Sequence, residues 1–452
     1  MASISQQPYT NDAHIDAIVK ALRDGGHLLC SNLAASSKAF VVEETFRQMG
    51  GQHLIVCADK EDAAYFYNDL ESLLGERGTD YSKKQVLFYP TSYKRPYEPE
   101  KADNTYILSR TEVLQRVSTS ERKTLIVSYP EALSEKVFTR KLLAKNTFKV
   151  KVGDKINLDF LTDVLYEYEF ESVDFVVEPG QFAIRGGLVD VFSFANDYPY
   201  RIEFFGDKVD SIRSFNIADQ LSIEQLKQIV LLPNMQERAF IEEREAILQY
   251  LPSTTTVWLT DMAFFATQVD KEYDRAVEAF EKMQTEQEEE VKALKPGQLF
   301  SKSEELLESL IKHPTVEFGV SSKLSIINSQ LSIVNFHTKP QPIFSKNFNL
   351  LIDDIAQHKE EGYRVIVFSE SSKQLSRIQA ILNDINHNDE LHRDFETETI
   401  AIHGGFIDED LKVCCYTDHQ IFERYHRFHL RDTFSTKQAI TLKDLSELKP
   451  GD

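Results

Sequence analysis

Cysteine and tryptophan are scarce in this sequence. Its 452 residues include four cysteines and one tryptophan. None of the cysteines forms a CxxC pair or stands at zinc-finger spacing from histidine, which argues against a zinc site or a disulfide framework. We therefore expect reduced, mostly buried thiols at Cys30, Cys57, Cys414 and Cys415.

Long apolar runs are also missing. No stretch approaches the roughly 20 apolar residues that a membrane-spanning helix needs. The polar segment 1–11 lacks the charged and then apolar pattern of a signal peptide. We therefore expect a cytoplasmic protein without a membrane partner.

Positive charge is in deficit, and this bears on the kind of partner. The chain has 51 Lys and Arg residues against 72 Asp and Glu residues, a net charge of -21. A protein that binds duplex DNA normally carries a basic patch that displaces phosphate counterions. A local patch is compatible with this composition, but the overall field repels nucleic acid. The sequence therefore favours protein partners.

The sequence does contain a clear change in its predicted secondary-structure pattern along the chain. Apolar strands first alternate with helices of roughly 10–15 residues, which is typical of a doubly wound parallel sheet. Strand-rich segments with glycine turns follow and predict an α+β insert. The predicted units are 1–140 and 234–340 for a degenerate nucleotide-binding-like sheet domain in two halves, 141–233 for the insert, 341–430 for a small α/β domain, and 431–452 for a linker.

The strands expected in the insert and in the small domain are short and rich in Val, Ile and Phe. In the insert they form an antiparallel meander over Phe175–Val177, Gln181–Phe192, Tyr200–Phe205 and Lys208–Phe215. In the small domain they are Arg364–Ser369, Ile400–Ile402 and Lys412–Tyr416.

A degenerate nucleotide site follows the first predicted strand. A P-loop reads G-x-x-x-x-G-K-[ST]; its backbone N–H groups hold phosphate and its hydroxyl ligates magnesium. Lys38 stands at the lysine position, but Asn32 and Ser37 replace the two glycines and Ala39 replaces the hydroxyl residue. A chance Ser-Ser-Lys before a helix is the alternative. Either interpretation predicts no ATP hydrolysis at this site.

The strands around Arg185 and Arg201 are the second informative feature. Side chains alternate between the two faces of a strand, so Phe182 and Ile184 are expected to face the interior while Arg185 faces outward. Ile202 and Phe204 likewise share an apolar face. The opposite face then carries Arg201, Glu203 and Phe205.

Arginine beside an exposed aromatic is the composition of a protein-binding hot spot. The candidate partner-binding residues are therefore Arg185, Arg201, Glu203 and Phe205. A decorated surface strand with Phe205 tucked under a loop is the alternative, and the strand pattern leaves both open.

These strands lie in segments that resemble a known module. The segments are Gly180–Phe192, which reads GQFAIRGGLVDVF, and Arg201–Arg213, which reads RIEFFGDKVDSIR. Both resemble the module shared by the excinuclease component UvrB and the transcription-repair-coupling factors, which binds UvrA through an exposed hairpin face. The resemblance assigns two contact arginines to Arg185 and Arg201, an aromatic contact to Phe205 and an acidic position to Glu203.

Two segments favour the coupling factors over UvrB. UvrB has an intact P-loop and a long aromatic hairpin that clamps damaged DNA, and Tyr89–Pro99 is too short for that clamp. The segment Tyr250–Asp261 resembles the Walker-B region of UvrB, but the acidic pair reads Thr260 and Asp261 here.

The C-terminal part also resembles the coupling factors. Gly404–Asp408 and Lys412–Tyr416 look like their small third domain, and Leu445–Asp452 looks like the entry to their RNA-polymerase-interacting domain. In that family, a longer chain adds polymerase binding, an ATP-dependent translocase for double-stranded DNA, and a C-terminal domain that masks the UvrA face. We expect this chain to be a fragment of such a protein, although a natural short protein is compatible with the sequence.

The resemblance implies a non-catalytic scaffold that recruits UvrA to lesion-stalled RNA polymerase in transcription-coupled nucleotide excision repair. We expect no cofactor in this chain, since ATP and magnesium belong to the motor of the longer protein. The alternatives are a working ATPase or damage-binding clamp of the UvrB type, and a structural or regulatory protein unrelated to UvrA.

Overall fold

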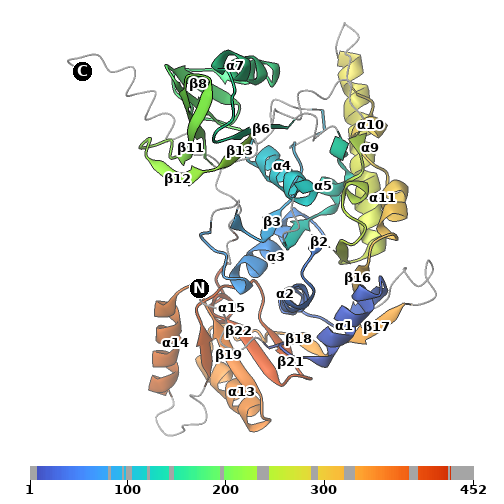
Figure 1. The fold of residues 1–452 in the computed structure, drawn as a ribbon. Coiled ribbons are helices and arrows are strands. Elements are labelled where there is room, and N and C mark those ends of the chain that lie inside the picture. The colour runs from blue at the N-terminus through green and yellow to red at the C-terminus, as the bar shows by residue number, and fades with distance from the viewer. Residues whose placement is uncertain are drawn as a thin grey trace.

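The computed structural model describes residues 8–79, 83–93, 96–97, 104–119, 123–141, 147–193, 198–231, 244–286, 294–319, 331–385, 395–425 and 428. These residues form a mixed α/β molecule with three larger sheets (Figure 1). The predicted fold class, a nucleotide-type parallel sheet with an α+β insert and a further small α/β unit, is confirmed.

The largest sheet is parallel and has seven strands in the order β17-β1-β16-β15-β2-β4-β3. Strands β1, β4, β15 and β16 are buried along their whole length, as expected for a parallel sheet covered by helices. The strands are β1 (His27–Ser31), β2 (Gln52–Val56), β3 (Val86–Phe88), β4 (Thr124–Ser128), β15 (Thr256–Leu259), β16 (Thr315–Phe318) and β17 (Ser332–Asn335).

Helices connect and cover these strands. They are α1 (Ala13–Arg23), α2 (Ser37–Met49), α3 (Lys60–Leu73), α4 (Asn104–Thr119), α5 (Pro130–Ser134), α8 (Ile247–Tyr250), α9 (Met262–Glu286), α10 (Pro296–Leu299) and α11 (Ser303–Leu310). A two-stranded ribbon of β5 (Val137–Phe138) and β14 (Arg244–Glu245) lies where the chain leaves for the insert and returns.

Helix α1 shows how the local sequence sets these elements. The Asp12 carboxylate accepts hydrogen bonds from the backbone N–H groups of His14 and Ile15, which caps the N-terminus. Lys20 and Arg23 in the last turn complement the helix dipole. The buried residues recur on one face of the helix and are Ile15, Ile18, Val19 and Leu22.

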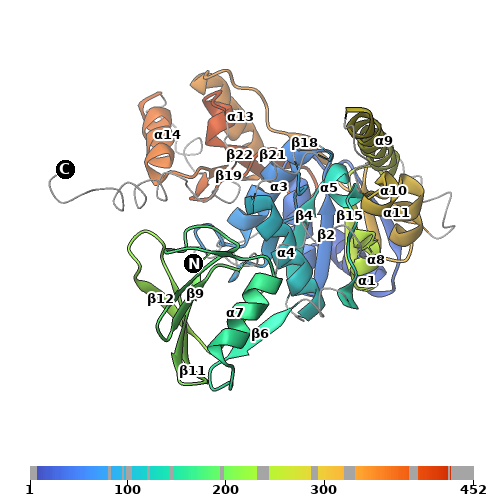
Figure 2. The same cartoon turned by 90° about the horizontal axis from the view of Figure 1, so that it is seen from above.

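The insert has its own sheet and core. Its six strands run in the order β12-β11-β10-β9-β8-β7, and a separate ribbon joins β6 to β13. The elements are β6 (Phe148–Lys151), α7 (Leu158–Glu167), β7 (Glu171–Ser172), β8 (Gln181–Arg185), β9 (Leu188–Val191), β10 (Tyr200–Phe205), β11 (Lys208–Phe215), β12 (Ser222–Leu226) and β13 (Gln228–Leu231). Figure 2 shows the insert standing out from the parallel-sheet unit, away from the C-terminal unit.

The C-terminal unit is a five-stranded sheet in the order β18-β21-β22-β19-β20 with helices packed on it. Its elements are β18 (Thr338–Pro340), α13 (Phe348–Glu360), β19 (Arg364–Phe368), α14 (Ser372–Ile385), β20 (Glu396–Glu398), β21 (Phe406–Asp408), β22 (Val413–Thr417) and α15 (Asp418–Ile421). We call it the third unit. The expected linker, 431–452, lies outside the described residues.

Two predicted strands are wrong. Phe175–Val177 is a loop, because the N–H groups of Val177 and Glu178 donate to the side-chain oxygen of Gln181 and not to a neighbouring strand. Ile400–Ile402 is also irregular. Instead of pairing in its own sheet, this segment crosses to the parallel-sheet unit, where Ile402 joins the hydrophobic core.

The four cysteines are buried free thiols, as their spacing predicts. Burial raises the pKa of Cys30 to about 12, so this thiol stays protonated at neutral pH. Within the described residues, no helix combines the length and the apolar character that crossing a bilayer requires.

Candidate partner-binding face and degenerate nucleotide site

The candidate partner-binding face is built on three neighbouring strands of the insert. In β9, Asp190 lies directly opposite Ala183 of β8 and Arg201 of β10. The hairpin turn between β8 and β9 uses Gly186 with a φ of 62°, a conformation that glycine adopts without strain. This register brings Arg185 and Arg201 to the same carboxylate.

Asp190 binds both arginines. Its side chain is only 1% exposed, and it accepts hydrogen bonds from Arg201 Nε at 2.7 Å and Arg201 Nη2 at 2.8 Å. The Nη2 group of Arg185 donates to the same carboxylate. A buried carboxylate is tolerable only when it is paired in this way, so the cluster carries its own counter-charge.

The two arginines differ in exposure. The Arg201 side chain is 14% exposed, also donates to Gln220 at 3.0 Å and lies 4.3 Å from the ring centroid of Phe215. The hydrogen bond to Asp190 raises the pKa of Arg201. Arg185 is 38% exposed. The expectation that both guanidinium groups stand free on the surface is therefore wrong for Arg201, because a buried acid draws it inward.

Glu203 and Phe205 lie further along β10. Glu203 accepts hydrogen bonds from Ser211 and from Arg213 at 3.0 Å, and the Ser211 contact is the main cause of its lowered pKa. Phe205 is 81% exposed beside the turn at Gly206. No loop in the described part of the chain shelters its ring, so the alternative interpretation of a covered Phe205 is not supported.

Ile184, on the apolar face of β8, is more exposed than strand alternation predicts. It was expected to face the interior with Phe182, yet it is 38% exposed while Phe182 is fully buried. Strand β7 pairs with β8 only at Gln181 and Phe182. Beyond that point no described strand pairs with β8 on that side, so Ile184 is exposed at the edge of the sheet, on the face opposite to Arg185.

The degenerate nucleotide loop is occupied by protein groups. Ala34 N donates to Thr338 Oγ1 at 2.6 Å, and Ser36 N donates to the Gly404 carbonyl at 3.2 Å. Asn32, with a φ of 59°, accepts from Thr338 through its carbonyl. In an intact P-loop such N–H groups would hold phosphate.

The side chains of the loop point to other roles as well. The Ser37 hydroxyl donates to the Ala34 carbonyl at 2.6 Å, and Ala39 is fully buried in the core. Lys38 lies 5.8 Å from the ring centroid of Phe318. No hydroxyl therefore stands at the position where an intact loop would ligate magnesium.

The space next to this loop is small. The cavity lined by Lys38, Cys57 and Thr260 has a volume of about 150 Å³, whereas ligand clefts usually hold about 300–1,000 Å³. Asp261 is exposed and caps helix α9 by accepting from Phe264 N at 2.6 Å. The two residues at the Walker-B position are thus separated, since only Thr260 lines the cavity.

The third unit closes the cavity. The Asp69 carboxylate accepts from Ser36 Oγ at 2.6 Å and from the backbone N–H of His403 at 2.6 Å. The His403 ring stacks on Tyr65 with 3.7 Å between ring centroids. Burial raises the pKa of Asp69 to about 7 and lowers that of His403 to about 4.

Gly404 fits this contact closely. Its N–H donates to Ser36 Oγ at 2.8 Å, and a Cβ at this position would come within 2.9 Å of the Ala35 Cβ. Sequence reasoning missed Asp69 and His403, because no local pattern signals a contact between residues 334 positions apart. It gave Gly404 only as part of a family resemblance and not as a contact.

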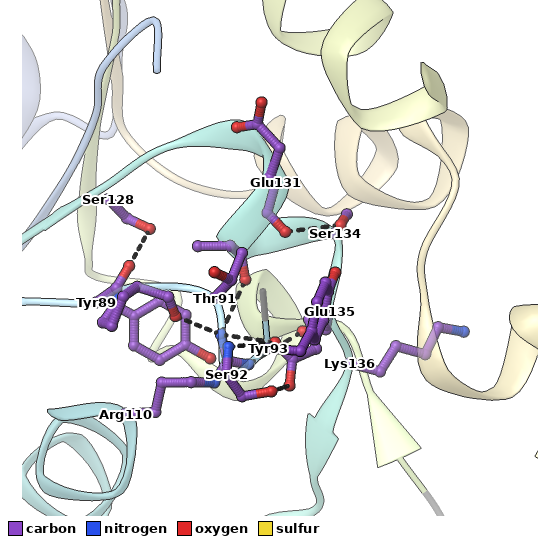
Figure 3. Close-up of polar contacts among 12 residues, drawn as sticks. Tyr89, Thr91, Ser92, Tyr93, Arg110, Ser128, Glu131, Ser134, Glu135 and Lys136 are labelled. Carbon is purple, nitrogen blue, oxygen red and sulfur yellow. Dashed lines mark hydrogen bonds and ion pairs between the residues drawn. The ribbon is translucent and has the colours of Figure 1, made fainter. Parts of the chain in front are cut away.

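The segment after β3 is fixed by a buried ion pair (Figure 3). Arg110 donates to the Pro90 carbonyl at 2.8 Å and lies 3.3 Å from the Glu135 carboxylate. Ser92 donates to Glu135 through its hydroxyl at 2.5 Å and through its backbone N–H. These bonds hold the start of Tyr89–Pro99 against the sheet, and the described part of that segment forms no hairpin.

The geometry describes a class of protein in which a filled nucleotide-type fold carries an inserted, mostly antiparallel sheet with an exposed arginine and an exposed aromatic ring. The sequence model of the UvrB interaction domain family matches residues 148–236, which cover the strands β6 to β13. The insert therefore corresponds to the region that the UvrB interaction domain model matches.

The whole chain is similar to transcription-repair-coupling factors. It is 22% identical to that of Bacillus subtilis over 96% of this chain and 42% of the relative. It is 29% identical to that of Myxococcus xanthus over 48% of this chain and 18% of the relative. The Escherichia coli factor is 26% identical over 47% of this chain and 18% of its own length. The chain spans less than half of these relatives and resembles their N-terminal region.

Proposed function

We propose that this chain is the UvrA-docking part of a transcription-repair-coupling factor and works by binding, without catalysis. The observation that carries the proposal is the exposed pair Arg185 and Phe205 on a UvrB interaction domain. In transcription-coupled nucleotide excision repair, the chain recruits UvrA to RNA polymerase that has stalled at a lesion.

The proposed binding face offers both hydrogen-bond donors and exposed apolar surface. Arg185 donates only to Asp190 among the described residues, so most of its five N–H donors remain for an acidic or carbonyl group of UvrA. Phe205, on the face of the sheet that carries Arg201 and Glu203, supplies exposed apolar surface. An arginine and an aromatic ring that become buried together are typical of residues that dominate binding energy.

The degenerate nucleotide site supports a scaffold over an ATPase. The N–H groups of Ala34 and Ser36 already donate to the third unit, and the adjoining cavity is too small for a nucleotide. The parallel sheet thus serves to carry the insert. No metal or nucleotide takes part in binding UvrA.

The longer protein supplies the remaining functions. Its motor, with ATP and magnesium, moves on double-stranded DNA and displaces RNA polymerase, and its C-terminal domain masks the Arg185 face until polymerase is engaged. An exposed apolar and basic face in need of masking agrees with this role. The protein acts in the cytoplasm.

A titration of the fluorescently labelled chain with UvrA tests the proposal. The wild-type chain binds, and Arg185→Ala weakens binding at least roughly tenfold, the low end of the cost of truncating a buried interface charge. Phe205→Ala weakens it as well. Arg275→Ala is the matched control, since Arg275 is an exposed arginine that also pairs with a buried acid, Glu272, but lies on helix α9.

The control variant binds like the wild type. If the wild-type chain does not bind UvrA, or if Arg185→Ala and Phe205→Ala both bind as tightly as the wild type, the proposed face is wrong.

A further inference from the structure

Within its described strands, the sheet of the insert buries one acidic side chain, Asp190, and this position calls for an explanation. Asp190 is the buried acidic residue among the described residues of the insert, and its side chain is 1% exposed. Removing a carboxylate from water costs several kcal/mol before pairing, and apolar residues of similar size often give equal or greater stability. Folding alone therefore does not call for an acid at this position.

The geometry of Asp190 is asymmetric with respect to the two arginines. Among the described residues, Oδ1 accepts from Arg201 Nε alone, while Oδ2 accepts from Nη2 of Arg201 and also from Nη2 of Arg185. Arg201 is further held by Gln220 and by the ring of Phe215. These contacts hold Arg201 in place. Because Oδ2 of Asp190 accepts from both arginines, it also fixes Arg185 relative to Arg201.

Arg185 is held from two sides but remains open on a third. Its guanidinium lies 5.3 Å from the ring centroid of Phe175 and donates to Asp190, while 38% of its side chain is exposed. A guanidinium fixed in this way loses less conformational entropy when it forms a two-pronged hydrogen bond.

We propose that Asp190 is a positioning residue, which orients the Arg185 guanidinium so that its free N–H donors meet a carboxylate of UvrA. This proposal rests on the proposed function and names the chemistry of the partner surface. Two arginines and one aspartate leave one net positive charge on the cluster, so a single acidic side chain of the partner balances it. Phe205, exposed on the same face of the sheet as Arg201, adds apolar surface for the partner.

A double-mutant cycle tests the positioning role. UvrA affinity is measured for the wild type, Asp190→Asn, Arg185→Ala and the double variant, with melting temperatures recorded for all four. We expect Asp190→Asn to weaken binding at least roughly fivefold in the wild type but less than about twofold in the Arg185→Ala background. The melting temperatures show how far the insert stays folded in each variant, so a merely structural effect is separable from the coupling in binding.

Equal weakening in both backgrounds, or no weakening in either, overturns the positioning role while leaving UvrA docking intact. Absence of binding by the wild-type chain overturns both proposals. Arg185→Lys gives a second test that leaves Asp190 in place, because lysine keeps the charge but loses the planar fork. We expect it to bind at least roughly tenfold more weakly with an unchanged melting temperature; wild-type affinity of this variant contradicts the proposal.

Discussion

Asp190 determines how each of the two arginines can act. Arg201 is drawn into the sheet and Arg185 is left half-open, although both occupy outward positions in the strand pattern. Side-chain alternation identifies the face on which a residue begins, but a long side chain can fold back along that face toward a buried charge. Strand alternation alone does not take the buried charge of Asp190 into account.

Arg201→Ala should therefore destabilise the insert. The substitution removes the two-pronged partner of a carboxylate that is 1% exposed, and Arg185 alone compensates only in part. We expect a loss of about 2 kcal/mol in the free energy of unfolding, measured by urea denaturation. For Arg185→Ala the loss stays below about 1 kcal/mol, because this side chain is half-exposed. Equal stability of Arg201→Ala and the wild type would contradict the role of Arg201 as the main partner of the buried Asp190 carboxylate.

At the scale of elements, the parallel sheet was predictable because its strands are short apolar runs separated by helical segments. The element that sequence reasoning placed wrongly in the third unit, Ile400–Ile402, has the composition of a strand. Its residues are buried against another unit, and periodicity reports burial without saying which surface provides it.

The loop between β1 and α2 shows what sequence can and cannot give for a site. The replacements Asn32, Ser37 and Ala39 indicate a lost P-loop from spacing alone. That its N–H groups donate to Thr338 and Gly404 depends on contacts across some 300 residues, for which the sequence has no local signal.

ATP should not bind at this loop. A titration with labelled ATP and magnesium should give no saturable binding tighter than about 1 mM, because donors that would hold phosphate are already satisfied and the cavity is small. Tight, magnesium-dependent binding that is lost in Lys38→Ala would revive an ATPase of the UvrB type.

At the scale of the whole molecule, the buried carboxyl of Asp69 links the parallel sheet to the third unit. Its pKa is raised to about 7, against about 3.9 in an unfolded chain. The folded protein therefore holds this proton more tightly. The stability from Asp69 is complete below about pH 4 and is lost as the pH rises to about 7. His403, with a pKa of about 4, acts in the opposite sense only below about pH 6.5.

Asp69→Asn should remove this pH dependence. Between pH 6.5 and pH 8 we expect the wild type to lose about 1 kcal/mol more stability than the variant, measured by urea denaturation at both values. The difference between the two proteins isolates Asp69 from other groups that titrate in this range. Parallel pH profiles for the two proteins would show that Asp69 is ionised in the folded state.

The central claim is that one face of the insert, and not the nucleotide-type sheet, binds UvrA. Hydrogen exchange of the chain with and without saturating UvrA tests this claim most directly, since each backbone amide reports its own protection. The account predicts slowed exchange concentrated in β8, β9 and β10, with little change around Lys38. Protection around Lys38 and none in these three strands would contradict it.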